Sequence, residues 1–429
     1  MFCDLVGSTA LSTRFDPEDL RELIGPYHRA VADTVGRFDG FVAKYMGDGV
    51  LVYFGYPQAH EDDAERAVRA GLAVIEAVGR VPAQEDLRVR LGVASGLAVV
   101  GDLIGQGAAQ ERGIVGEVPN LAARLQALAA LDTLVISEAT RRQIGTLFEI
   151  EDLGPQALAG FAAPLRVWRV TGEGSVVSRF EALRGEALTP FVGREEEIDL
   201  FLRRWQLAIA GEGQVVLLSG EAGIGKSRLL GALHDRLAGE PHTRMRYFCS
   251  PYHQDSALHP FIAQLERAAG FQREDGADRK LDKLRRLLAP DTRADDEIEL
   301  LAELLSLPNS AAELSLSPQR KRELQFETLL HQLEALALRQ PVLFICEDLH
   351  WIDPSSRELL DRTIGHVARL PVLLVATYRP EFAPAWIGLP QVTTMTLARF
   401  DRRAGAAMVE RIGGGDALAG EVVAEIVGR

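Results

Sequence analysis

The chain is poor in cysteine and in positive charge, and each shortage argues against a class of protein. Its 429 residues include three cysteines and 7% aromatic residues, and the formal net charge is −14. Cys3, Cys249 and Cys346 each lie in an apolar, strand-like run without metal-ligand spacing, which indicates a reduced, cytoplasmic protein. The acidic balance argues against nucleic acid or an anionic membrane as a partner.

Long hydrophobic runs are also absent. No apolar stretch approaches the roughly 20 residues of a membrane-spanning helix, and we find no signal peptide, repeat or low-complexity segment. The length suits two or three domains, each able to bury its own core. We therefore expect a cytoplasmic, multidomain protein with no membrane or nucleic-acid partner.

Helical and strand-like patterns alternate over residues 1–172. A short strand precedes Asp4, a helix begins at Pro17 with Asp16 as its N-cap, and two apolar runs flank a turn at Asp48 in a hairpin pattern. The further elements that we expect are a helix from near Glu61, strands within 88–100 broken at Gly92 and Gly96, a helix over 118–130 and a strand over 133–136. This order predicts an α+β, ferredoxin-like sheet with helices packed on one face.

A second pattern begins after residues 173–188, a stretch without periodicity that we interpret as a linker. The pattern predicts a helix over 195–210, a strand over 214–219, a glycine loop, another helix, and continuous apolar strands at 341–346 and 371–376. Such strands are buried on both faces, which favours a parallel sheet covered by helices. We expect an α/β protein whose P-loop ATPase core spans 189–395 and whose residues 396–429 begin a helical lid.

Residues 220–227, GEAGIGKS, fit the GxxxxGK[ST] phosphate-loop pattern between an apolar strand and a helix. Backbone amides of such a loop close around phosphates at a helix N-terminus, the lysine supplies positive charge and the hydroxyl holds Mg²⁺. A chance glycine turn is the alternative, and the flanking strand and helix disfavour it. The expected ATP-binding residues are Gly220, Gly223, Gly225, Lys226, Ser227 and Arg228, with Ser227 as a metal ligand.

Two acids, Glu347 and Asp348, end a later apolar strand. One would hold the Mg²⁺ shell, a role that we give to Glu347, and the other would orient the attacking water. A solvated pair of acids at a strand end is the simpler alternative. Arg379 ends the next apolar strand, where a cation could sense the γ-phosphate, and a surface salt bridge is its alternative.

This second half resembles the signal-transduction ATPases with numerous domains, a P-loop class of regulatory switches. The matching segments are 191–195, 220–227, 347–354 and 376–380, and the resemblance covers about 190–429. It implies that Val192, Gly193 and Arg194 border the base of ATP, and that an unknown protein effector exists.

Two aspartates in the first half each follow an apolar run at a small-residue turn. Asp4 stands in FCDLVGST and Asp48 in KYMGDGV. Carboxylates beside glycine amides suit a pair of Mg²⁺ ions that hold a triphosphate. Asn120 and Arg124 share a helix face at i, i+4, where a neutral donor and a guanidinium suit a ribose oxygen and a phosphate that gains charge. A hairpin-turn aspartate and a surface helix pair are the simpler alternatives.

The combination resembles the class III nucleotidyl cyclases over about 1–172, through segments 2–9, 44–49 and 116–125. The resemblance implies the following roles: Asp4 and Asp48 bind two Mg²⁺ or Mn²⁺ ions, Leu5, Val6, Gly7 and Ser8 cradle the phosphates of ATP, Lys44 contacts the base, and Asn120 and Arg124 stabilise the transition state. It also implies that metal and transition-state residues come from opposite partners, which requires a homodimer.

The implied reaction is attack of the ribose 3′-oxygen of ATP on the α-phosphorus, which yields cyclic AMP and pyrophosphate. Lys44 resembles the adenine-selecting residue, whereas guanylyl cyclases generally place Glu there. We therefore expect an adenylate cyclase in intracellular signalling that is regulated by the ATP-binding half.

A non-catalytic function is the second hypothesis, in which a weak or inactive cyclase-like half only dimerises on an ATP-dependent switch or scaffold. Gly113 and Ala159 favour it, because relatives often carry Asp or Thr at the first position and Lys at the second. The short strand before Asp4 favours it too. A transcription regulator is disfavoured because we see no helix-turn-helix signal or basic patch. The domain order resembles bacterial relatives of soluble adenylyl cyclases, and it predicts a fragment truncated at both ends.

Overall fold

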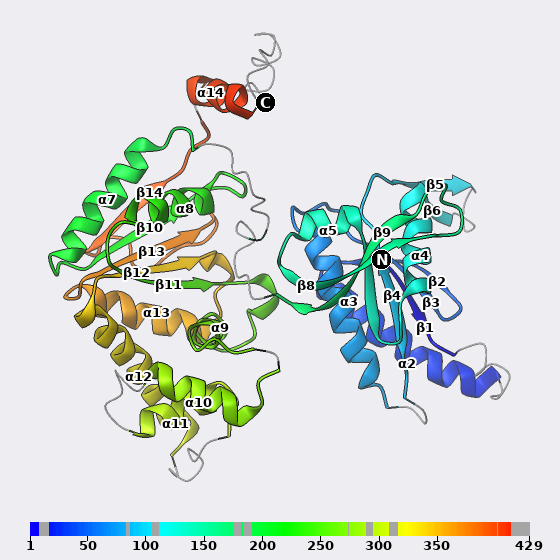
Figure 1. The fold of residues 1–429 in the computed structure, drawn as a ribbon, viewed down its shortest axis with the longest axis horizontal. Helices are drawn as coiled ribbons and strands as arrows, with labels where there is room; N and C mark the ends of the chain where they lie inside the picture. Colours follow the sequence, from blue (N-terminus) through cyan, green and yellow to red (C-terminus); the bar gives the residue numbers. More distant parts are fainter. Residues whose placement is uncertain are drawn as a thin grey trace. The chain divides into compact units, whose positions relative to one another are not determined.

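The computed structural model describes residues 1–7, 17–82, 86–104, 111–174, 182, 191–272, 274–288, 295–308, 316–400 and 402–412. The chain divides into two compact units, 1–187 and 188–429 (Figure 1). Each unit has its own sheet and its own hydrophobic core. Within the described ranges, none of the helices combines the length and the hydrophobicity needed to cross a membrane.

The strands of the first unit's main sheet are β1 (Phe2–Leu5), β2 (Phe41–Met46), β3 (Gly49–Tyr53), β4 (Val89–Val93), β7 (Thr133–Ser137), β8 (Phe148–Gln156) and β9 (Leu165–Glu173). Their order is β2-β3-β1-β4-β7-β9-β8. The first four follow the ferredoxin-like order, which confirms the predicted fold class. The short strand β1 lies between β3 and β4, is antiparallel to both, and buries Cys3 and Leu5.

The helices of this unit are α2 (Pro17–Gly36), α3 (Asp63–Gly79), α4 (Glu117–Leu128) and α5 (Glu138–Ile144). The helix predicted to start at Pro17 does so, and its predicted cap, Asp16, lies outside the described residues. A separate two-stranded hairpin joins β5 (Val99–Ile104) and β6 (Glu111–Val115). The strands β8 and β9 and the helix α5 were not predicted, because the sequence patterns gave no distinct signal there.

Helices cover both faces of this sheet, so the prediction of helices on one face was incomplete. On one face, α2 and α3 pack with Leu134 and Ile136 of β7. On the other, Leu125 of α4 packs against Val135, the residue between those two. Asp4 also faces this second side, because its neighbours in β1 point into the first core.

Gly92 explains how α4 comes so close to the sheet. We expected this glycine to break a strand, but β4 runs through it without interruption. A Cβ atom at Gly92 would lie 2.2 Å from the carbonyl oxygen of Ala122 and 2.4 Å from the amide nitrogen of Gln126. The glycine therefore serves helix–sheet packing, and only the absence of a side chain lets the α4 backbone rest on β4.

The strands of the second unit are β10 (Gln214–Ser219), β11 (Thr243–Phe248), β12 (Val342–Glu347), β13 (Val372–Tyr378) and β14 (Val392–Thr396). They form a fully parallel sheet in the order β11-β12-β13-β10-β14. Every residue of β10, β12 and β13 is buried, which confirms the three predicted strands and their burial on both faces.

The helices of this unit are α7 (Glu195–Ile209), α8 (Lys226–Leu237), α9 (His259–Ala268), α10 (Ala277–Leu288), α11 (Asp295–Leu304), α12 (Pro318–Arg339), α13 (Pro354–Val367) and α14 (Arg402–Ile412). α7 and α8 cover one face of the sheet, and α9, α12 and α13 cover the other (Figure 1). The segments 243–248 and 392–396 and the helices α9 to α13 were not predicted.

Gly92→Ala should destabilise the first unit by about 3 kcal/mol or more, because the new methyl group overlaps the α4 backbone. Urea unfolding of the 429-residue chain, followed by circular dichroism, measures the change. Gly79→Ala is the control, since Gly79 is the exposed last residue of α3 with open space around its Cβ position, and it should gain roughly 0.4–1 kcal/mol. Equal stability of Gly92→Ala and the wild type would contradict the packing role.

Two candidate nucleotide sites

Asp4 and Asp48 meet at the end of β1. β1 places Asp4 opposite Gly49 of β3, and Asp48 stands in the turn just before Gly49. The two carboxyl groups share a hydrogen bond. Burial, then the charge of Asp48 and this hydrogen bond, raise the pKa of Asp4 to about 6. Two carboxylates in contact are a suitable ligand set for a divalent cation.

Two neighbours of Asp4 were missed by the sequence reasoning. The side-chain nitrogen Nε2 of Gln126 donates a hydrogen bond to Oδ2 of Asp4 at 3.2 Å, and Gln126 is buried. Arg90 lies opposite Asp4 in the β1–β4 register, and both neighbours lower the pKa of Asp4. The sequence feature that could have pointed to Gln126 is its position directly after the buried Leu125, which places it on or near the buried face of α4.

Asn120 and Arg124 lie on the other side of α4. Both side chains are exposed. Around the helix axis they lie about 120° and 160° from Gln126, so they project away from the Asp4–Asp48 pair of their own chain. The structure therefore brings the two aspartates together but leaves the predicted transition-state pair on an outward face.

Lys44 lies in β2 opposite Leu51 and is exposed. In a regular strand Lys44 and Asp48, four residues apart, would point to the same face. The strand is not regular here, because a β-bulge precedes Lys44 and the chain turns at Gly47, whose φ is +67°. Strand geometry alone does not place the lysine beside Asp48.

The predicted phosphate cradle is only partly described. Leu5 is buried in the core, and Gly7, with φ of +81°, starts a turn. The amide of Val6 donates to the carbonyl oxygen of Arg88 at 2.8 Å, so this N–H group belongs to the sheet rather than to a phosphate. Ser8 lies outside the described residues.

In the second unit, the phosphate loop surrounds its own lysine. Nζ of Lys226 donates to the carbonyl oxygens of Gly220, at 2.7 Å, and Glu221, at 2.9 Å. Gly223 and Gly225 have φ values of +71° and +103°, which only glycine adopts readily. The structure confirms the strand–loop–helix context that the phosphate-loop pattern requires.

The predicted metal ligands of this unit lie together. Oγ of Ser227 donates to Oε2 of Glu347 at 2.8 Å. Glu347 is 1% exposed, and its other carboxylate oxygen pairs with Arg246 of β11. The sequence reasoning missed Arg246, which balances the buried charge of Glu347.

Asp348 and Arg379 complete this edge of the sheet. Asp348 has a left-handed backbone with φ of 62°, and its amide donates to Oγ1 of Thr377 at 3.0 Å. Burial, then the charge of Glu347, raises the pKa of Asp348 to about 6, while Lys226 and Arg379 oppose the shift. A carboxylate with such a pKa can accept a proton from water near neutral pH.

The segment predicted to border the base is fixed by residues that follow β14. Gly193 has φ of +67°, and a Cβ there would lie 3.2 Å from the ring of Phe400. Arg194 pairs with Glu197 at 2.9 Å, and its guanidinium lies 4.6 Å from the centre of the Phe400 ring. Next to Val192, the ring of Phe191 lies 5.6 Å from the guanidinium of Arg228 in α8, so this segment adjoins the phosphate-loop helix.

Each site supplies a small set of protein ligands. Among the residues that the structure describes, no group of three or more His, Cys, Asp or Glu side chains could hold a metal ion. The pairs Asp4–Asp48 and Ser227–Glu347 fit Mg²⁺ instead, because this ion is commonly held by one or two oxygen ligands from protein together with water and substrate phosphates.

Comparisons with known proteins identify a family for each half of the chain. Residues 1–172 match the model of the adenylate and guanylate cyclase catalytic domain, and residues 190–375 match that of the AAA ATPase domain. An uncharacterized protein of Rhizobium meliloti (strain 1021) is 35% identical over 401 residues, which are 93% of this chain and 39% of that protein. Adenylate cyclase 1 of the same organism is 27% identical over 190 residues, 42% of this chain and 28% of that protein.

Among solved structures, the adenylyl cyclase CyaB from P. aeruginosa is 28% identical, with 40% of this chain and 92% of that chain covered and a TM-score of 0.38. The chain spans 39% and 28% of the lengths of the two curated relatives. It joins a member of the adenylate and guanylate cyclase catalytic-domain family to a member of the AAA ATPase domain family.

Proposed function

We propose that the first unit is an adenylate cyclase that converts ATP to cyclic AMP and pyrophosphate with Mg²⁺ or Mn²⁺. The observation that carries the proposal is the contact between Asp4 and Asp48, combined with the outward position of Asn120 and Arg124 on α4. The family match of residues 1–172 and the similarity to Adenylate cyclase 1 support it.

The proposed reaction is attack of the ribose 3′-oxygen on the α-phosphorus, with pyrophosphate as the leaving group. Divalent cations bound at Asp4 and Asp48 would polarise the phosphate and lower the pKa of the attacking hydroxyl. Arg124 would balance the charge that grows on the α-phosphoryl group, and Asn120 would orient the ribose. In this proposal Lys44 selects adenine, and the turn at 5–8 holds the phosphates.

The active unit would be a homodimer. Arg124 and Asn120 project away from their own aspartates, so a complete site requires these side chains from a second copy. Leu97, which is 97% exposed, and Val99, which is 71% exposed, add apolar surface at the start of the β5–β6 hairpin that a second copy could cover.

The second unit would act as an ATP-binding switch that regulates the cyclase and responds to a protein effector. The contact of Ser227 with Glu347 supports ATP·Mg²⁺ binding, and the raised pKa of Asp348 supports a role of this residue in orienting water. Arg379 would sense the γ-phosphate. The cytoplasm is the compartment that we propose, because Cys3, Cys249 and Cys346 are free thiols.

Asp48→Ala should lower cyclic AMP formation from ATP and Mg²⁺ by roughly 100-fold or more, because metal ions contribute several kcal/mol to such a transition state. The assay follows cyclic nucleotide by chromatography, with ATP and GTP in competition, and cyclic AMP should be the main product. Asp152→Ala, which removes an exposed carboxylate of β8 paired with Arg166, should retain wild-type activity. Wild-type rates in Asp48→Ala would contradict the proposal.

Lys226→Ala should weaken ATP binding to the second unit by roughly 10- to 100-fold, the range expected for a charge-assisted phosphate contact. Calorimetry on the Asp48→Ala background isolates this site from the cyclase site. Lys280→Ala, a substitution in α10, should bind ATP as the wild type does. Equal affinity of Lys226→Ala and the control would exclude a phosphate role for this lysine.

A non-catalytic first unit is the second candidate function, and the amide of Val6 favours it because this group is already bonded to Arg88. In that case the first unit would only dimerise. ATP binding that depends on Lys226, together with no detectable cyclic nucleotide from the wild type, would decide for this function.

A further inference from the structure

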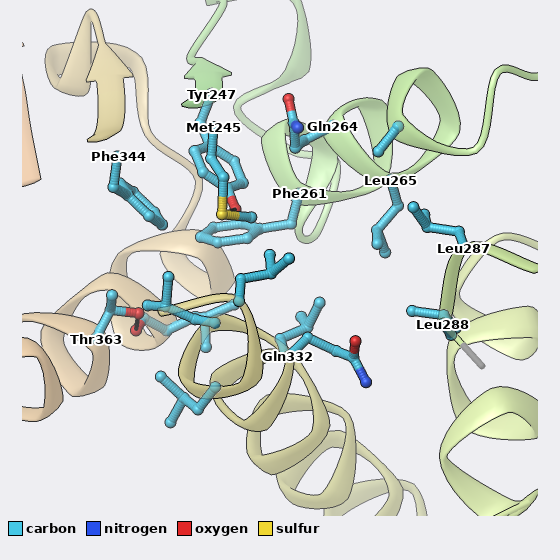
Figure 2. Close-up of a pocket in the computed structure, with 16 residues that line it drawn as sticks. Met245, Tyr247, Phe261, Gln264, Leu265, Leu287, Leu288, Gln332, Phe344 and Thr363 are labelled. Carbon is cyan, nitrogen blue, oxygen red and sulfur yellow. Dashed lines mark hydrogen bonds between the residues drawn. The ribbon is translucent and has the colours of Figure 1, made fainter. Parts of the chain in front are cut away.

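A cavity lies in the second unit, on the face of the sheet covered by α9, α12 and α13 (Figure 2). Its volume is about 90 Å³. Side chains of β11 and β12 form one wall, and helices α9, α10, α12 and α13 supply the rest. The 16 lining residues are mostly leucine and aromatic residues, and none of them carries a charge.

One polar group in this wall is a hydrogen-bond donor without an acceptor in the part of the chain that the structure describes. Gln332 of α12 is 8% exposed, and its Nε2 atom is buried with no hydrogen-bond partner among the residues that the structure describes. Figure 2 shows its amide reaching from α12 toward Leu288 of α10. A buried amide that donates to nothing is costly, so a bound acceptor would stabilise it.

The other polar side chains of the wall are already bonded. The hydroxyl of Thr363 donates to the carbonyl oxygen of Leu359 at 2.8 Å, and the carbonyl oxygen of the Gln264 side chain accepts from Arg267 at 2.9 Å. The hydroxyl of Tyr247 lies 3.9 Å from the sulfur of Met245. Among the polar side chains of this wall, Gln332 is therefore the one with a buried nitrogen that lacks a hydrogen-bond partner within the described residues.

The size and chemistry of the cavity define the ligand class. A cavity of about 150 Å³ that holds benzene gives about 25 Å³ for each heavy atom, so 90 Å³ holds roughly three or four heavy atoms. An ion is disfavoured, because the lining offers no opposite charge to compensate its desolvation. We propose that this cavity binds a small, neutral, apolar molecule with one hydrogen-bond acceptor, such as a carbonyl oxygen, which receives the Gln332 N–H group.

The same two strands carry the cavity wall and the nucleotide site. Tyr247 of β11 and Phe344 of β12 line the cavity. Arg246 and Glu347 project from the opposite face of these strands, where they pair beside Ser227. A ligand that displaces the wall would therefore shift the Arg246–Glu347 pair, and its occupancy should change ATP affinity. This coupling rests on the proposed ATP site, whereas the binding itself does not.

Binding is tested with acetone, which carries the acceptor, and 2-methylpropene, which has the same number of heavy atoms without it. Saturation-transfer NMR on the 429-residue chain should detect both, with acetone bound more tightly. Gln332→Leu should weaken acetone binding roughly tenfold and leave 2-methylpropene unchanged. Gln325→Leu is the matched control on α12, because the Gln325 amide donates to the carbonyl oxygen of Leu300 outside the cavity.

Ala268→Leu provides a second variant, since Ala268 is an exposed lining residue at the end of α9 where a larger side chain occupies space without reaching the core. It should weaken binding of both compounds. Undetectable binding of both compounds to the wild type, or equal acetone affinity of Gln332→Leu and Gln325→Leu, would overturn the proposed site.

The coupling is tested by calorimetry of ATP binding on the Asp48→Ala background. Saturating acetone should change the Kd for ATP by at least about threefold, and Ala268→Leu should abolish this effect at the same concentration. An unchanged Kd would overturn the coupling. Lys226→Ala should weaken ATP binding and retain acetone binding, so failure of the ATP site and failure of the cavity site give different results.

Discussion

The contact between α4 and β4 at Gly92 is the constraint on which the first unit depends. It fixes the rotation of α4, because the helix backbone lies directly on the strand. That rotation directs Gln126 to Asp4 and leaves Asn120 and Arg124 facing outward. A single glycine thus determines both the environment of Asp4, the proposed metal ligand, and the surface from which Asn120 and Arg124 would serve a second copy.

In the second unit, the strand order of the sheet brings the site residues together, rather than one close contact between a helix and a strand. Parallel strands end at the same edge of the sheet, so β10 and β12 bring Ser227 to Glu347 although β13 lies between them. Arg246 enters from β11 and balances the buried acid. On their other face, β11 and β12 form a wall of the cavity, so the two faces of this sheet differ in chemistry.

The sequence predicted the elements that carry a strong local pattern. β10 was predicted at its observed bounds, and the glycine loop and helix around Lys226 were predicted in their observed order, because apolar runs and glycine spacing are local signals. Arg246 and Gln126 were not foreseen, since each matters through a partner more than 100 residues away in the chain. Gly92 was misread as a strand break, because the sequence does not show which helix a glycine will meet.

The central claim is that one chain holds the metal-binding and transition-state halves of a cyclase site on different faces. Mixing Asp48→Ala with Arg124→Ala, each inactive as a homodimer, tests it most directly. Random pairing makes half of the dimers mixed, with one intact site of two, so cyclic AMP formation should return to roughly a quarter of the wild-type rate. A mixture as inactive as its components would contradict the account.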